Sequence, residues 1–249
     1  DIAVIAEGYT KDEMGKFRDD VKKLSNYLFD TDPFTKYRDK INIYAVEAVS
    51  EESGTDIPGK GIYVNTALNT SYYTFDVERY LTTQDIETIN DYAAVVPHDQ
   101  IFILINSSTY GGGGVYNYYT ASTIDNKFSP EVIVHEFGHG FAGLADEYYS
   151  GETAYEDFYQ LDVEPWEPNL TTRVNFDAKW KSMISAGVPI PTPNDPGYSG
   201  KIGLFEGGGY MTKGIYRPSY DCRMNTLQAP GFCQVCRKAI EEMILFYTE

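Results

Sequence analysis

The sequence predicts an α+β fold with α/β-like character, in which helices pack on a mixed, twisted β-sheet. Residues 101–105 are five consecutive apolar residues, as expected of a central strand that is buried on both faces. Periodic segments in the first half follow the order helix, strand, helix, strand, strand. Residues 150–215 are rich in Pro, Gly, Asn and Asp, which predicts an irregular second half.

The first elements are a strand and a helix. Residues 2–6 form an apolar run that we expect to be a buried strand. Thr10 and Glu13 then have the spacing of a capping box, in which each side chain binds the other's backbone N–H. The helix that follows should end at the turn formed by Asp32 and Pro33. Its apolar residues recur at helical spacing: Phe17, Val21, Leu24 and Leu28.

The middle of the chain predicts further strands, a helix and two loops. Residues 41–49 alternate apolar and polar side chains, as in a half-buried strand, and residues 50–62 are a loop rich in Ser, Gly and Pro. A helix is expected over residues 84–95. Residues 107–114 should form a loop ending in four glycines, and residues 115–123 alternate again, which predicts an edge strand.

Ser129 and Pro130 predict the start of a third helix, with Ser as the N-cap and Pro at the first helical position. In the second half we expect a short helix near residues 178–186. An amphipathic helix over residues 235–247 should close the chain.

The chain of 249 residues is long enough to bury a core, as one large or two modest domains. We interpret residues 1–249 as a single domain of two subdomains. The upper subdomain, residues 1–143, holds the sheet and the third helix. The lower subdomain, residues 144–249, is rich in loops and ends in a helix.

The formal net charge of −17 excludes several classes of partner. An acidic surface repels phosphate backbones and anionic lipids, so we expect no nucleic acid and no membrane-surface partner. The sequence contains no run of 18 apolar residues, and we therefore expect no membrane span. The chain opens at Asp1 without a signal peptide, so we expect a processed or trimmed chain that lacks an upstream export signal or an extra domain.

Residues 135–139 read His-Glu-Phe-Gly-His, a pattern that predicts a zinc site. Side chains four apart on a helix differ by about 40° and about 6 Å of rise. His135 and His139 can therefore bind one zinc ion at Zn–N distances of about 2.0–2.1 Å. Glu136 lies beside them and can act as the general base that takes a proton from a zinc-bound water nucleophile.

A catalytic zinc needs a third protein ligand, and we favour Asp146 over its neighbour Glu147. On a straight helix Asp146 would lie about 16 Å beyond His135, out of reach. Gly143 can end the helix in the left-handed conformation and let the chain fold back. A glycine tolerated within a continuing helix is the alternative, because Leu144 and Ala145 are good helix formers.

The pattern His-Glu-x-x-His-x-x-x-Gly-x-x-Asp resembles the elongated motif of the metzincins, with one extra residue before the glycine. This variant is similar to the IgA-peptidase family of bacterial zinc metalloendopeptidases, the igalysins. The similarity extends over most of the chain, with further matching segments at residues 7–10, 106–112, 216–219 and 222–224.

The resemblance implies a metzincin-like catalytic domain, with Met224 in the methionine turn beneath the metal. Many metzincins carry a Tyr two residues after that Met, but this chain has Thr226 there. A tyrosine that stabilises the oxyanion would then come from elsewhere, and the candidates are Tyr148, Tyr216 and Tyr220.

The resemblance further implies a secreted or cell-surface bacterial enzyme that hydrolyses peptide bonds of extracellular proteins. Its partner would be a protein or peptide substrate, such as an immunoglobulin or another glycoprotein, and we expect a monomer. In metzincins an edge strand binds the substrate as an added strand, a role that residues 115–123 would have beside a mobile glycine rim.

Two alternatives remain open from the sequence. A thermolysin-like site would take a distant Glu from a helix over residues 152–167, but this segment is proline-bearing and weakly helical. A catalytically weak, peptidase-like module could instead bind protein or glycan through a tyrosine-rich surface. The presence of Glu136 argues against this module, because a pure binder needs no base.

Three cysteines lie within fifteen residues, at positions 222, 233 and 236. One disulfide and one leftover thiol is the expected arrangement, with free thiols as the alternative. A structural zinc site would need four ligands, and no fourth is evident nearby in the sequence.

Overall fold

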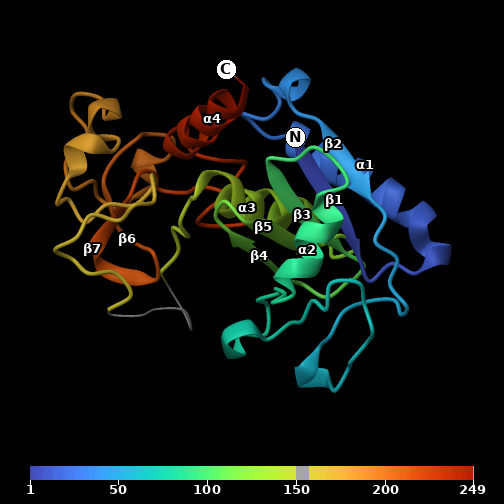
Figure 1. Ribbon diagram of the computed structural model, residues 1–249. Coiled ribbons are helices and arrows are strands. Elements are labelled where there is room, and N and C mark those ends of the chain that lie inside the picture. Colours follow the sequence, from blue (N-terminus) through green and yellow to red (C-terminus); the bar gives the residue numbers. More distant parts are fainter. Residues whose placement is uncertain (150–156, 249) are drawn as a thin grey trace. The chain divides into compact units, whose positions relative to one another are not determined.

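The computed structural model describes residues 1–149 and 157–248 (Figure 1). The chain forms two compact units. The first comprises Asp1–Phe141 with Tyr247–Glu249, and the second comprises Ala142–Phe246. The interpretation of the chain as one catalytic domain stays a prediction.

The first unit is built on a five-stranded sheet in the order β2-β1-β3-β5-β4. Strands β1, β2, β3 and β5 run parallel, and β4 lies antiparallel at the edge. This mixed sheet confirms the expected α+β class. The strands are β1 (Ile2–Glu7), β2 (Ile43–Val46), β3 (Gln100–Ile105), β4 (Gly112–Val115) and β5 (Tyr119–Thr123).

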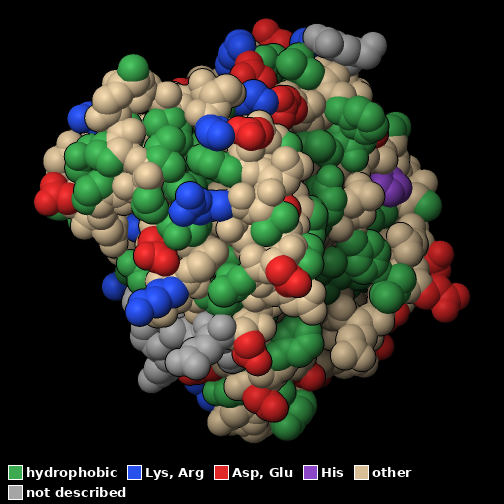
Figure 2. Space-filling model, turned by 90° about the vertical axis from the view of Figure 1, so that its left-hand side faces the viewer, with side chains coloured by type: hydrophobic (Ala, Val, Ile, Leu, Met, Phe, Trp, Pro, Cys, Tyr) green, Lys and Arg blue, Asp and Glu red, His purple; other side chains and the backbone are tan. Residues whose placement is uncertain are grey.

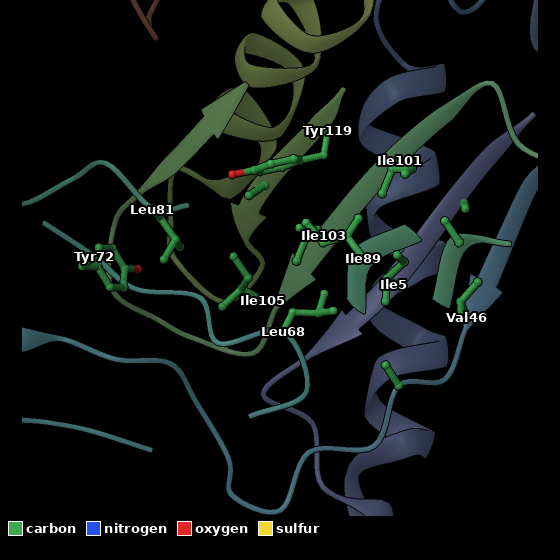
Figure 3. Packing of buried hydrophobic residues seen from close by; sticks show 14 of the residues in the cluster. Ile5, Val46, Leu68, Tyr72, Leu81, Ile89, Ile101, Ile103, Ile105 and Tyr119 are labelled. Carbon is green, nitrogen blue, oxygen red and sulfur yellow. The ribbon is translucent and has the colours of Figure 1, made fainter. Parts of the chain in front are cut away.

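Helices cover both faces of this sheet. Ile89 packs with Ile5 and Ile103 on one face (Figure 3). Because successive side chains of a strand point to opposite faces, Phe102 lies on the other face, where its ring centroid is 6.3 Å from that of Phe137. Every residue of β3 is buried, so the prediction of a buried central strand is confirmed. The helices are α1 (Met14–Phe29), α2 (Ile86–Ala93) and α3 (Ser129–Ala142).

The capping box predicted at Thr10 and Glu13 is confirmed. The Glu13 carboxylate accepts hydrogen bonds from the Thr10 backbone N–H and hydroxyl, each at 2.9 Å. The box caps a single 3-10 turn, Lys11–Glu13, which leads directly into α1. The helix expected over residues 84–95 is also confirmed as α2, with Asp85 as its N-cap.

The expected edge strand over residues 115–123 is wrong, because the edge of the sheet is formed by the glycines themselves. β4 contains Gly112 and Gly114, and β5 lies inside the sheet between β3 and β4. A Cβ atom on Gly114 would lie 2.4 Å from the Glu136 carbonyl oxygen, so β4 runs closer to α3 than any side chain allows. The glycines permit this close approach of two backbones.

The second unit is largely irregular, as predicted for the described part of residues 150–215. The helix expected near residues 178–186 is wrong, since only 3-10 turns form there, at Phe176–Ala178 and Lys181–Met183. Tertiary packing explains this, because the buried Trp180 indole between the turns donates to the Gly203 carbonyl. The regular elements are β6 (Phe205–Gly208), β7 (Met211–Arg217) and α4 (Gln234–Thr248).

The surface carries charges of both signs. On the face shown in Figure 2, acidic and basic side chains are interspersed, and the acidic ones do not gather in a single patch. The acidic side chains are therefore spread over this face. Among the described residues, none of the helices has the length and apolar character that crossing a membrane requires.

Candidate active site

Helix α3 carries the His-Glu-Phe-Gly-His motif and is fixed in the first unit by aromatic packing. It begins at Ser129, and its Phe137 and Phe141 rings stack with centroids 5.2 Å apart. Both rings are also tilted against Phe34. Because the aromatic face of α3 is buried and well packed, the helix has a fixed orientation. The polar side chains of the motif are half-buried.

The two histidines of the motif converge. Their Nε2 atoms are 3.1 Å apart, and the ring planes are almost perpendicular, at 86°. Two nitrogens that bind one zinc ion tetrahedrally at 2.0–2.1 Å are separated by about 3.3 Å. The spacing of His135 and His139 therefore fits one zinc ion, as the helical periodicity predicts.

Glu136 lies between α3 and the edge strand of the same unit. A Cβ atom built on Gly112 would lie 2.8 Å from Cγ and 3.1 Å from Cδ of Glu136. The Glu136 side chain thus occupies the space that the missing side chain of Gly112 leaves. Sequence reasoning identified the glycine run but could not place it here, because the contact depends on tertiary structure.

In the second unit, Asp146 and Glu147 have different surroundings. Helix α3 ends at Ala142, and Gly143 has φ 60°, the left-handed conformation predicted for a helix exit. Asp146 is buried, and its carboxylate accepts a hydrogen bond from the Tyr210 hydroxyl. Glu147 is fully buried.

Glu147 is held by several groups of the second unit. The Asn169 amide donates to its Oε1 at 3.0 Å, and its own backbone N–H donates to the Met224 carbonyl at 2.7 Å. Desolvation by burial raises the pKa of Glu147 well above its ordinary value. The two neighbouring carboxylates that the sequence left as alternatives are therefore chemically distinct.

Met224 and the candidate tyrosines also lie in the second unit. Met224 is fully buried, and Thr226, which replaces the expected tyrosine, hydrogen-bonds to Asp221. Tyr148 packs edge-on against Tyr210, with ring centroids 5.3 Å apart. Tyr216 lies in β7, and the Tyr220 ring packs against Phe205.

Sequence reasoning missed Tyr210. Its only sequence signal is that it follows three glycines, Gly207, Gly208 and Gly209, in the turn of the β6–β7 hairpin, where its φ is 64°.

Comparison with protein families matches the chain to the family described as IgA Peptidase M64, over residues 1–198 and 194–244. The chain belongs to the IgA peptidase M64 family. This confirms the resemblance inferred from the motif and supports a metallopeptidase function for this M64 protein. No curated protein matches the chain.

The cysteines of this M64 peptidase differ from the expected arrangement. All three are free thiols, and the Cys222 and Cys236 sulfurs are 3.7 Å apart, too far for a disulfide. A fourth potential ligand, which the sequence did not reveal, is present in Glu147. Cys236 donates from its sulfur to Glu147 Oε1 at 3.3 Å.

Proposed function

We propose that the chain is a zinc-dependent metalloendopeptidase of metzincin-like type that hydrolyses peptide bonds of extracellular proteins. The observation that carries this proposal is the 3.1 Å separation of the His135 and His139 Nε2 atoms, with Glu136 beside them on one helix. Two imidazoles in this arrangement, with a Glu directly after the first histidine, are typical of zinc peptidases.

His135, His139 and Asp146 would hold the metal. Two observations favour Asp146 as the third ligand. Gly143 turns the chain directly after α3, and Asp146 follows only three residues later. Glu147 lies instead among the three cysteines, where its Oε1 accepts hydrogen bonds from Asn169 and Cys236.

The thermolysin-like alternative gains no support from the described residues. Of the segment 152–167 that this alternative needs to be helical, residues 152–156 lie outside the described residues, and residues 157–167 contain no helix. A distant Glu ligand would need such a helix to present it.

When bound, zinc would act as a Lewis acid that polarises a carbonyl and lowers the pKa of water toward neutrality. Glu136 accepts the proton of the attacking water as the bond to the peptide carbon forms. The same carboxyl then gives this proton to the departing amine nitrogen, so Glu136 returns to its starting state. Its place beside Gly112 limits its rotation and keeps it available for both transfers.

The substrate would bind in extended form along β4, the edge of the sheet. The start of β4 is already engaged, since Gly112 exchanges backbone hydrogen bonds with Arg79 and Leu81. A peptide would therefore pair with the strand after Gly112, next to the α3 backbone. An immunoglobulin or another glycoprotein would be the natural substrate of a secreted or cell-surface bacterial enzyme, acting as a monomer.

The test is the variant Glu136→Gln, with Glu87→Gln on the exposed side of α2 as a matched control. Removing the general base should lower cleavage of denatured casein by about 10²–10⁴-fold and leave the zinc content unchanged. The control should cleave at the wild-type rate. Wild-type cleavage by Glu136→Gln would refute the mechanism, and a zinc-loaded wild type that cleaves no peptide would favour the binding module.

A further inference from the structure

Four potential metal ligands converge inside the second unit, apart from the motif on α3. Their ligand atoms lie within 4.8 Å of one another. From this geometry we infer that the second unit holds a structural zinc ion, with four ligands: Glu147, Cys222, Cys233 and Cys236.

The distances match tetrahedral zinc coordination. Two thiolates bound at about 2.3 Å are separated by about 3.8 Å, and a thiolate and a carboxylate oxygen by about 3.5 Å. The Cys222 and Cys236 sulfurs are 3.7 Å apart, and the Cys236 sulfur is 3.3 Å from the Glu147 oxygen. A disulfide would instead require about 2.05 Å between the sulfurs.

The burial of these groups favours a bound cation. The exposed fractions of Glu147, Cys222 and Cys236 are 0%, 1% and 0%. One carboxylate oxygen of Glu147, Oε2, is buried and has no hydrogen-bond partner among the described residues. A buried carboxylate with such an oxygen is costly unless it is paired or coordinates a metal, and a zinc ion among the three sulfurs would supply the missing partner.

The surroundings of the four ligands resemble the outer shell of a metal site. The Cys233 backbone N–H donates to the Cys222 sulfur at 3.2 Å, and the Asn169 amide holds the Glu147 carboxylate at 3.0 Å. Three thiolates and one carboxylate leave a formal charge of −2 around a divalent ion. The start of α4 at Gln234 and the buried Arg217 guanidinium favour such a charge.

The ligand set indicates which metal binds and what it does. Three thiolates favour zinc over magnesium or calcium, which prefer oxygen ligands. Four protein ligands close the coordination shell, so the ion would be structural and not catalytic. It would join α4 to the Cys222–Met224 turn and to Glu147, the neighbour of Asp146. The site would thereby fix the chain segment that carries Asp146.

Cobalt substitution tests this inference separately from the peptidase mechanism, because Co²⁺ bound by thiolates shows a charge-transfer absorption that His and Asp ligands do not give. The variant H135A/H139A, produced with Co²⁺, should retain one equivalent of metal with this absorption. Cys236→Ser should lose the absorption. Ala239→Ser, which puts a hydroxyl at a buried position of the same helix, should retain it.

Two results would overturn the inference. One is an H135A/H139A protein without thiolate-bound cobalt. The other is a wild-type intact mass that lacks two hydrogens, which would show a disulfide among the three cysteines. Since the histidine variant keeps all four proposed ligands, its spectrum decides the question even if Cys236→Ser does not fold. The failure of the peptidase mechanism would appear elsewhere, in the cleavage rate of Glu136→Gln.

Discussion

Glycine 112 provides a direct test of how the first unit positions the general base. The variant Gly112→Ala places a methyl group 2.8 Å from Cγ of Glu136. Carbon atoms that are not bonded prefer separations of about 3.5–4.0 Å, so the Glu136 side chain must move by about 1 Å. A misplacement of this size at a catalytic group costs about 100-fold in rate, and we expect kcat/KM to fall by about this factor.

The stability of Gly112→Ala should change little. The Glu136 side chain is flexible and can shift, and the Ala121 carbonyl oxygen, 3.1 Å from the new methyl group, has to move only slightly. Ala is also favoured over Gly within a strand by about 0.5–1 kcal/mol, which offsets part of the crowding. Gly114→Ala should behave differently, because its methyl group would meet backbone, 2.4 Å from the Glu136 carbonyl oxygen. Overpacking of this kind costs about 1–3 kcal/mol and lowers Tm by about 2–4 °C for each kcal/mol.

Thermal unfolding and peptide cleavage by the zinc-loaded variants separate the two effects. Gly15→Ala on α1 is the control, because its methyl group would meet nothing within 4 Å. It should leave cleavage unchanged and stabilise the protein by about 0.5–1 kcal/mol. Wild-type kcat/KM in Gly112→Ala, with zinc bound, would show that β4 does not lie against Glu136.

Three further changes test the packing of the first unit. Glu7→Ala removes a buried carboxylate that accepts hydrogen bonds from residues 66, 68 and 70, and should lower the free energy of unfolding by about 3 kcal/mol, measured as the urea midpoint. Burial raises the pKa of Glu13, but its hydrogen bonds outweigh this effect and hold the pKa below its ordinary value of 4.5. Above pH 4.5 the wild type should therefore be more stable than Glu13→Gln. This difference in stability should disappear as the pH falls through the lowered pKa of the folded state. A difference independent of pH would contradict this. Phe137→Ala should cost about 3–5 kcal/mol by leaving a cavity beneath the motif, and a loss below 1 kcal/mol in calorimetry would contradict the packing of α3.

Several local features could be predicted from the sequence because they depend on nearby residues. The capping box at Thr10 and Glu13, the helix exit at Gly143 and the convergence of His135 with His139 each follow from spacings of a few positions. The central strand could also be predicted, because strands that are buried on both faces of a sheet form short, continuous apolar runs in the sequence.

Other features depend on contacts between distant residues and had no local signal. The glycines of β4 predicted a loop from the sequence. They are needed because β4 lies against α3, a helix whose contacting residues come 22 or more positions later in the chain. Glu147 and the cysteines that it approaches are 75 residues or more apart in the sequence, and no sequence motif predicts this contact. Tyr210 likewise reaches Asp146 because it lies in the β6–β7 hairpin. The glycines and the irregular register of this hairpin leave its strands without a recognisable sequence pattern.

The zinc site can be observed directly by anomalous diffraction at the zinc edge, from crystals grown with zinc. We expect an anomalous peak within bonding distance of the Nε2 atoms of His135 and His139, with the Glu136 carboxylate outside the coordination shell. A map without a peak at these two nitrogens, or with Glu136 bound to the metal as a ligand, would contradict it.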